Sequence, residues 1–197
     1  MIVTVLTPTF NRGGSLNNLY QSLQKQTIKD FEWLLVDDGS TDDTKNIAEE
    51  MRKKAKFPMR YIYKENGGKH TALNVGVKQI TLELTFIVDS DDTLVPDAIE
   101  TILQYHKKYK ERKDLCGYSF LRRFPDGKIN GKPFEPDEKV GTYIECRINA
   151  DDTQADKAEV FYTRCLKEFP FPEYRNEKFL GEDLVWIRMA LKYQMVH

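Results

Sequence analysis

The sequence predicts an α/β fold in which a mostly parallel sheet is sandwiched by helices. The first observation is the order of segments, because an apolar or β-branched run, a polar loop and an amphipathic helix follow one another four times within the first 113 residues. The second is that all four loops carry polar or charged residues and none is merely a Gly/Ser spacer. Alternating strands and helices are typical of parallel sheets, and right-handed crossovers bring the four loops to one edge.

The four strands are predicted from short apolar and β-branched runs, which suit strands that are covered on both faces. These runs lie at 1–6, 31–36, 60–63 and 84–88. The helices that follow are predicted from apolar residues three and four positions apart. These faces carry Leu16, Leu19, Tyr20 and Leu23, then Ile47, Ala48 and Met51, then residues of 69–80, and finally Ile99, Ile102 and Leu103. We expect Ser15 to cap the first helix, a capping box from Ser40 to Asp43 to precede the second, and Pro96 to open the fourth.

The alternation ends after about Lys113. We expect a strand at 116–124, a hairpin turn at 125–128, an irregular stretch at 130–156 and a helix at 159–169. A loop at 170–181 then leads to a last amphipathic helix, which carries Glu182 and Asp183 at its start. Because the chain stops within a residue or two of that helix, we expect it to be truncated at its C-terminus.

Bulk properties exclude several functional classes. The net charge is −1, so no overall positive field favours nucleic acid as a partner. The three cysteines are far apart and form no CxxC pair, which argues against a zinc knuckle or a disulfide framework and fits a reducing compartment. No signal peptide is apparent, and no run approaches the roughly 20 apolar residues of a spanning helix. We therefore predict a cytoplasmic protein, or one that faces the cytoplasm.

The most informative stretch is the end of the fourth predicted strand, where Asp89, Asp91 and Asp92 follow an apolar run. Ligands of parallel sheets bind beyond the carboxyl ends of the strands, and crowded carboxylates there are suited to Mg²⁺ or Mn²⁺. The alternative is an acidic turn that caps the next helix. The chain has no GxGxxG and no P-loop motif. A nucleoside diphosphate with a metal fits, with Lys69 or Arg12 as counter-charge.

Asp183 is a second candidate, because it begins a predicted helix directly after a loop that ends in Gly181. A carboxylate placed there can act as a general base towards a hydroxyl group, which contributes about 10²–10⁴-fold in rate. The alternative is a carboxylate that only stabilises the helix N-terminus, by about 0.3–1 kcal/mol. From this dipeptide alone, the stabilising role is the simpler interpretation.

Five segments together resemble the family 2 glycosyltransferases, which have the nucleotide-sugar-binding fold called GT-A. In order they are Thr7-Pro8-Thr9-Phe10-Asn11-Arg12, Val36-Asp37-Asp38-Gly39-Ser40-Thr41-Asp42, Asn66-Gly67-Gly68 through Asn74 and Gly76, Val88-Asp89-Ser90-Asp91-Asp92, and Gly181-Glu182-Asp183. The resemblance covers nearly the whole chain. One position departs from it, since many family members carry an arginine where this chain has Leu73, and Lys69 or His70 would supply that cation.

The resemblance implies a role for each matching residue. Thr7, Pro8 and Thr9 would line a nucleoside pocket with Arg12 nearby, and Asp38 would read the base. Asn66 and Lys69 would flank the nucleoside and diphosphate, and Asp89 and Ser90 would contact the ribose or donor sugar. Asp91 with Asp89 would hold Mn²⁺ or Mg²⁺, and Asp183 would be the catalytic base. Residues 1–115 would then be the donor-binding half of the domain and residues 116–197 the acceptor-side half.

The function that follows is a metal-dependent, inverting glycosyltransferase. It would move a sugar from a nucleoside diphosphate to a hydroxyl of a saccharide or lipid-linked saccharide, in the synthesis of envelope or exported polysaccharide. We take UDP as the default nucleotide because it is the commonest among similar proteins. A lipid-linked acceptor would place the protein at the inner face of the membrane, where the basic run 106–113 could touch anionic lipid. The alternative for that run is a solvated helix end.

Two other functions compete with this one. The stretch from Ile87 to Leu94 also matches the opening of haloacid-dehalogenase-type phosphohydrolases, with Asp89 as nucleophile and Asp91 as acid/base. That motif normally opens its fold, whereas three strand–helix units precede it here. The other alternative is a catalytically inactive module that binds sugar nucleotides. It would require a damaged site, and the acidic residues of both motifs are intact.

Overall fold

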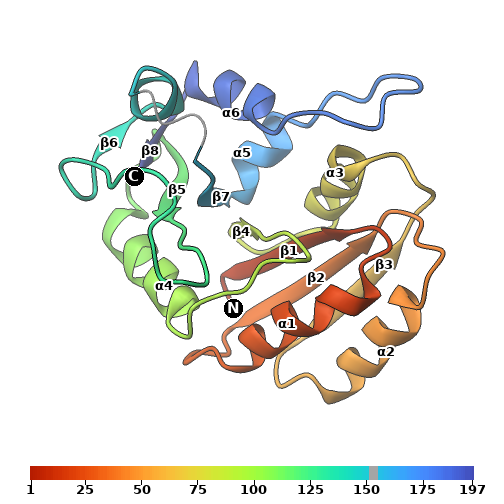
Figure 1. Ribbon diagram of the computed structural model, residues 1–197. Coiled ribbons are helices and arrows are strands. Elements are labelled where there is room, and N and C mark those ends of the chain that lie inside the picture. Colours follow the sequence, from red (N-terminus) through yellow and green to blue (C-terminus); the bar gives the residue numbers. More distant parts are fainter. Residues whose placement is uncertain (151–154) are drawn as a thin grey trace.

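One mixed sheet extends through the computed structural model, which describes residues 1–150 and 155–197 (Figure 1). Its strand order in the described part of the chain is β3-β2-β1-β4-β7-β5-β8-β6. The strands are β1 (Val3–Thr9), β2 (Phe31–Asp37), β3 (Met59–Tyr63), β4 (Leu84–Ile87), β5 (Leu115–Leu121), β6 (Val140–Gly141), β7 (Lys157–Tyr162) and β8 (Gln194–Val196). The pairs from β3 to β4 are all parallel, and β7 adds antiparallel pairs to β4 and β5.

Helices cover both faces of this sheet, which confirms the predicted α/β class. The helices are α1 (Gly13–Gln24), α2 (Thr44–Lys54), α3 (Lys69–Gln79), α4 (Ala98–Tyr109), α5 (Thr163–Glu168) and α6 (Asp183–Ala190), with one π-helical turn at Ile144–Ile148. Figure 1 shows α1 and α2 on one side of the β1–β3 strands and α3 on the other. Because both faces are covered, every residue of β1 and β2 is buried, as expected for central parallel strands.

The predicted starts of the first two helices were wrong in detail. The residue before α1 is Arg12, and the residue before α2 is Asp43, and neither helix has a side-chain cap. The Asp42 carboxylate instead accepts hydrogen bonds from the amides of Gly13, at 3.2 Å, and Thr44, at 3.0 Å. One carboxylate therefore serves the N-termini of both helices, because the two loops that precede them lie against each other.

The predicted helix at 159–169 was wrong over its first part. Lys157–Tyr162 forms strand β7, and the helix α5 begins only at Thr163. Val160, Phe161 and Tyr162 are β-branched or aromatic, which favours a strand, and β7 completes the hydrogen bonding of both β4 and β5. The chain also does not stop at the end of the last helix, since β8 follows α6 and pairs in parallel with β5.

Three further predictions were wrong in part: α4 begins at Ala98 and not at Pro96, β5 ends at Leu121 and not at residue 124, and the stretch expected to be irregular contains β6 and the π-helical turn. The hairpin turn at 125–128 is confirmed by hydrogen bonds from Phe124 N to Lys128 O and from Gly127 N to Phe124 O, both 2.8 Å long. Both halves of the chain contribute strands to the same sheet, and the division at residue 115 stays a prediction. In the part of the chain that the structure describes, no helix combines the length and the apolar character needed to cross a membrane.

Candidate functional site

The carboxyl ends of the four parallel strands lie at one edge of the sheet, as predicted. In the register of the sheet Thr9 pairs with Asp37, and Asp37 pairs with Tyr63, so β1, β2 and β3 end level with one another. Ile87 at the end of β4 pairs with Leu6 of β1. The loops at 10–12, 38–43, 64–68 and 88–92 leave this edge, and contacts between their side chains join them into one site.

The first two loops are tied together by backbone and side-chain hydrogen bonds. Asp38 N donates to Thr9 O at 2.8 Å, and Asn11 Oδ1 accepts from Thr41 N at 2.8 Å. The hydroxyl of Thr7 accepts a hydrogen bond from the Trp33 indole at 3.0 Å, so that side chain faces the interior. Thr9 Oγ1 is buried and has no hydrogen-bond partner among the described residues. Thr9 thus offers a buried hydroxyl group that is not used within the described part of the fold.

Asp38 organises the third loop. Its side chain is almost fully buried, and its two oxygens accept four hydrogen bonds from that loop. The donors are Lys64 Nζ (2.5 Å), Asn66 Nδ2 (3.0 Å), Gly67 N (3.0 Å) and Gly68 N (2.7 Å). Any contact between Asp38 and a nucleoside base would have to share these oxygens with the loop.

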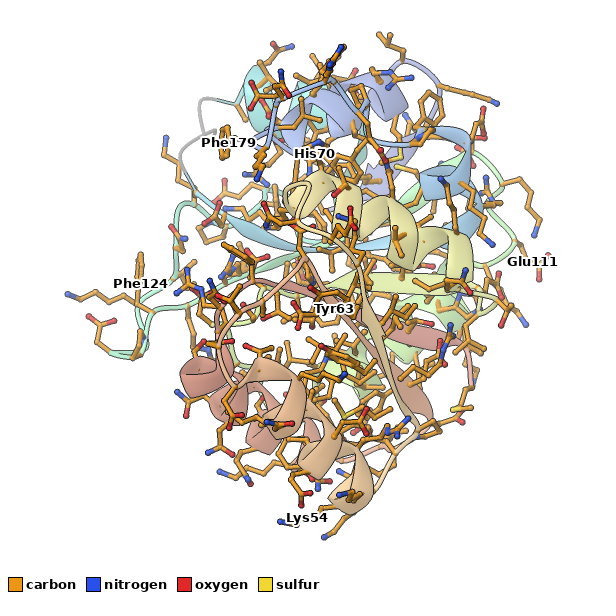
Figure 2. The ribbon with its side chains drawn as sticks, turned by 90° about the vertical axis from the view of Figure 1, so that its right-hand side faces the viewer. Lys54, Tyr63, His70, Glu111, Phe124 and Phe179 are labelled. Atoms are coloured by element: carbon orange, nitrogen blue, oxygen red, sulfur yellow. The ribbon has the colours of Figure 1, made fainter. Side chains whose placement is uncertain are left out.

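The loop before α6 packs on the third loop at Gly68. The φ angle of Gly68 is +98°, which an L side chain rarely adopts, and a Cβ there would lie 2.2 Å from the carbonyl oxygen of Lys178. Lys178 Nζ also donates to Asn66 Oδ1 at 2.7 Å. Figure 2 shows Phe179 and His70 at the same end of the molecule, where this loop meets the start of α3. A segment more than 100 residues distant in sequence thus borders the predicted nucleoside site.

Lys69 joins the third and fourth loops to the start of α6. Its ammonium nitrogen lies 2.6 Å from Asp89 Oδ1 and 2.9 Å from Glu182 Oε1. Burial lowers the pKa of Lys69, but the two carboxylates outweigh burial and raise it above its usual value. Lys69 is therefore a fixed positive charge between two helix N-termini, since it begins α3 and Glu182 directly precedes α6.

Asp89 and Asp91 are the accessible carboxylates of the acidic loop, with side chains 40% and 54% exposed. The Arg12 guanidinium lies 3.8 Å from Asp91, so the first loop also reaches this loop. Ser90 between them is buried. Asp92 pairs with Arg122, and burial raises the pKa of this carboxyl although Arg122 opposes the change. Arg122 is absent from the predicted residues, because the strand was expected to continue to residue 124, whereas β5 ends at Leu121 and leaves Arg122 at the strand end.

The residues present fit a divalent cation that completes its coordination with substrate. Asp89 and Asp91 offer hard oxygen donors on one short loop at the strand end, where both are accessible. Within the described ranges, no group of three or more His, Cys, Asp or Glu side chains is arranged to hold a metal ion. Mg²⁺ is commonly bound through one or two carboxylates, with substrate phosphates and water as the other ligands. The two aspartates match that kind of half-site.

A cavity of about 40 Å³ lies behind the acidic loop, which is room for at least one water molecule. Glu182, Asp89, Asp92 and Glu159 contribute to its lining. Glu159 on β7 pairs with Arg147 at 3.2 Å, and burial raises the pKa of Glu159 to about 8 although Arg147 opposes the change. Sequence reasoning missed Glu159 because it fell within the predicted helix.

Asp183 begins α6 beside Glu182, as predicted, and its side chain is exposed. A Cβ atom on residue 181 would lie 2.4 Å from Asp183 Oδ1, so the carboxylate turns back over Gly181. The missing Cβ gives Gly181 a role, because a side chain at this position would displace the carboxylate from where it lies. The start of α6 lies close to the acidic loop, because Lys69 pairs with Glu182 and also with Asp89.

Comparisons with known proteins agree on one family. Residues 4–162 match the family described as Glycosyl transferase family 2. The GalNAc(5)-diNAcBac-PP-undecaprenol beta-1,3-glucosyltransferase of Campylobacter jejuni is 28% identical over 95% of this chain and 59% of its own length. The poly(ribitol-phosphate) beta-N-acetylglucosaminyltransferase TarP of Staphylococcus aureus is 34% identical over 54% of this chain and 33% of its own.

Solved structures share the fold. The crystal structure of S. aureus TarS residues 1–349 superposes with a TM-score of 0.77 at 25% identity, and covers 100% of this chain and 58% of TarS 1–349. The complex of that fragment with UDP-GlcNAc gives a TM-score of 0.76 at the same identity and covers 56% of the TarS fragment. The chain therefore spans less than two thirds of the length of these relatives.

Proposed function

Because this chain belongs to glycosyl transferase family 2, we propose that it transfers a sugar from a nucleoside diphosphate, UDP first, to a hydroxyl group of a saccharide or lipid-linked saccharide. The observation that carries the proposal is the junction of Lys69 with Asp89 and Glu182, which assembles cations and carboxylates at the ends of the parallel strands. The named relatives transfer glucose to an undecaprenol-linked glycan and N-acetylglucosamine to poly(ribitol phosphate). Their acceptors support a role in envelope glycan synthesis.

The donor would lie across the four loops. We assign the nucleoside to Thr7, Pro8, Thr9, Asp38 and Asn66, and the ribose or donor sugar to Asp89 and Ser90. Asp38 would act together with the loop that it organises, since its oxygens already hold the amides of Gly67 and Gly68. Arg12 and Lys69 would neutralise the diphosphate. Asp91 with Asp89 would hold Mn²⁺ or Mg²⁺, which when bound would stabilise the leaving diphosphate as a Lewis acid.

The transfer would be an inverting single displacement with Asp183 as general base. The acceptor oxygen forms a bond to the anomeric carbon while the bond from that carbon to the diphosphate oxygen breaks. The proton of the acceptor hydroxyl passes to the Asp183 carboxylate. The absence of a side chain at Gly181 would leave room for this carboxylate at the start of α6. General base catalysis of this kind supplies about 10²–10⁴-fold in rate.

The acceptor would approach from the second half of the chain. A groove of about 840 Å³ begins at Asp91 and Asp92 and is bordered by α4 and by residues of the hairpin, such as Arg123 and Phe124. Its mixed polar and apolar lining fits a saccharide that is attached to an apolar carrier. We propose a cytoplasmic location, at the inner face of the membrane for a lipid-linked acceptor.

Binding of four nucleotides tests the donor proposal. We would measure UDP, GDP, CDP and dTDP by calorimetry, each with and without Mn²⁺, on the whole chain and on its Asp91→Asn variant. We expect one nucleotide to bind tightly only with Mn²⁺ and with Asp91 present. Binding of none, together with hydrolysis of simple phosphate esters, would favour the phosphohydrolase.

Turnover separates an enzyme from a binding module. Asp183→Asn should keep the nucleotide affinity and lower donor hydrolysis and transfer at least about 100-fold. A wild-type protein that binds the nucleotide and never turns over the donor would be the inactive module. The phosphohydrolase has no structural support, since Asp89 follows the fourth strand of the chain and the first three loops would be unused.

A further inference from the structure

The Lys69 ammonium group pairs with Asp89, one of the two carboxylates that would hold a divalent cation. We propose that Lys69 is an exchangeable counter-ion of Asp89: a divalent cation displaces it, and Lys69, still held by Glu182, then binds the diphosphate of the donor. This inference deepens the proposed function and rests on it. It gives Glu182 the part of a positioning residue, which touches neither the metal nor the donor.

The geometry allows the exchange. A lysine ammonium group has three donors, and two carboxylates lie within ion-pair distance of the Lys69 nitrogen, Asp89 at 2.6 Å and Glu182 at 2.9 Å. In the described part of the chain the third donor has no partner, so it is available to an anion. The Lys69 and Asp89 side chains are 42% and 40% exposed, so water and a ligand can reach both partners of the pair.

Glu182 would keep the ammonium group in place after Asp89 turns to the metal. The Glu182 side chain is 29% exposed, less than that of Asp89, and it precedes a helix whose position is set by buried residues such as Trp186 and Val185. Lys69 itself is anchored at the start of α3. The released charge therefore stays within the site and adds to the attraction for the diphosphate. Cation and diphosphate would each strengthen the binding of the other.

Arg12 and Asp91 form a second, looser pair of the same kind. Their nitrogen and oxygen are 3.8 Å apart, and each side chain is 54% exposed. Both aspartates that would hold the metal thus have a protein cation beside them. Since the Lys69 pair is the shorter, Lys69 should dominate the competition with a metal ion.

The proposal predicts effects of opposite sign on two ligands. Lys69→Met keeps the aliphatic stem and removes the charge. Mn²⁺ alone should then bind about threefold more tightly, because its competitor at Asp89 is gone. UDP in the presence of saturating Mn²⁺ should bind about tenfold more weakly, because a charged partner of the diphosphate is lost. A purely structural role for Lys69 would weaken both ligands together.

The test uses the whole chain, with free Mn²⁺ counted by electron paramagnetic resonance and UDP, or whichever nucleoside diphosphate binds best, measured by calorimetry. Lys192→Met is the matched control, because it removes the same charge from an exposed pair with Glu168 and should change neither affinity. Lys69→Gln is a second variant with the same expected signs, and thermal unfolding shows that each variant is folded.

The outcomes separate this inference from the function on which it rests. Tighter Mn²⁺ and weaker nucleotide binding in both Lys69 variants would support it. Unchanged or weaker Mn²⁺ binding in folded variants would overturn it, even where the wild type binds nucleotide as proposed. A wild type that binds no nucleoside diphosphate would instead overturn the proposed function, and with it the diphosphate step of this inference.

Discussion

The burial of Asp38 leads to a quantitative prediction for Asp38→Asn. Each carboxylate oxygen accepts two hydrogen bonds, Oδ1 from Lys64 and Gly67 and Oδ2 from Gly68 and Asn66. An asparagine keeps one oxygen and places an NH₂ group against the other two donors, whichever way it is turned. An unsatisfied buried donor costs about 1–3 kcal/mol, and two are created. We expect the free energy of unfolding to fall by about 3 kcal/mol.

Urea denaturation measures this change, and hydrogen exchange locates it. The midpoint should move to lower urea with an unchanged m-value, and the amides of Gly67 and Gly68 should exchange faster. Asp43→Asn is the control, since Asp43 is exposed and its substitution should alter stability by no more than about 0.5 kcal/mol. An Asp38→Asn protein as stable as this control, with both amides still protected, would refute the view that Asp38 organises the third loop.

Two further predictions concern Gly181 and Glu159. Gly181→Ala should lower kcat about 10- to 100-fold with nearly unchanged nucleotide affinity. The reason is that the new Cβ would lie 2.4 Å from Asp183 Oδ1 and would displace that carboxylate. Normal turnover of the variant would contradict the assigned geometry. Glu159 has a pKa raised by burial to about 8 from 4.5, so the folded state holds its proton more tightly and its contribution to stability is lost as the pH rises through this range. Relative to wild type, Glu159→Gln should therefore become more stable as the pH rises from 5 to 8, by at most about 5 kcal/mol in the free energy of unfolding. Thermal unfolding of both proteins across this pH range measures the difference. A difference that is independent of pH would count against the raised pKa.

Much of the fold could be predicted because its central strands are buried on both faces. The runs that became β1, β2 and β4 are short and mostly apolar or β-branched, and a strand of this kind needs no knowledge of its neighbours to be recognised. The position of the polar loops could also be predicted, because right-handed crossovers between parallel strands bring all of these loops to one edge of the sheet. The predicted convergence of the four loops was confirmed by the register of the strands.

The errors arose where long-range pairing decided the structure. Lys157–Tyr162 has a pattern compatible with a helix, and it became a strand because β4 and β5 each needed an antiparallel partner at that place. The expected caps at Ser15 and Ser40 failed because Asp42 reaches both helix starts across two loops. For β7 and for the start of α1, a partner that is distant in sequence satisfied the backbone groups, whereas at α2 the partner is Asp42, two residues before Thr44.

The sequence by itself determined the class of fold, the edge of the sheet at which the site lies, and the acidic motif at the end of β4. Its information is local, since periodicity and motif spacing describe a residue and its near neighbours. Only the tertiary structure decided which charges meet there. The pairing of Lys69 with both Asp89 and Glu182, and the enclosure of the Asp38 carboxylate by the third loop, depend on packing of segments that are distant in sequence. Such contacts carry no sequence period, because the position of one partner is set by the whole sheet between them.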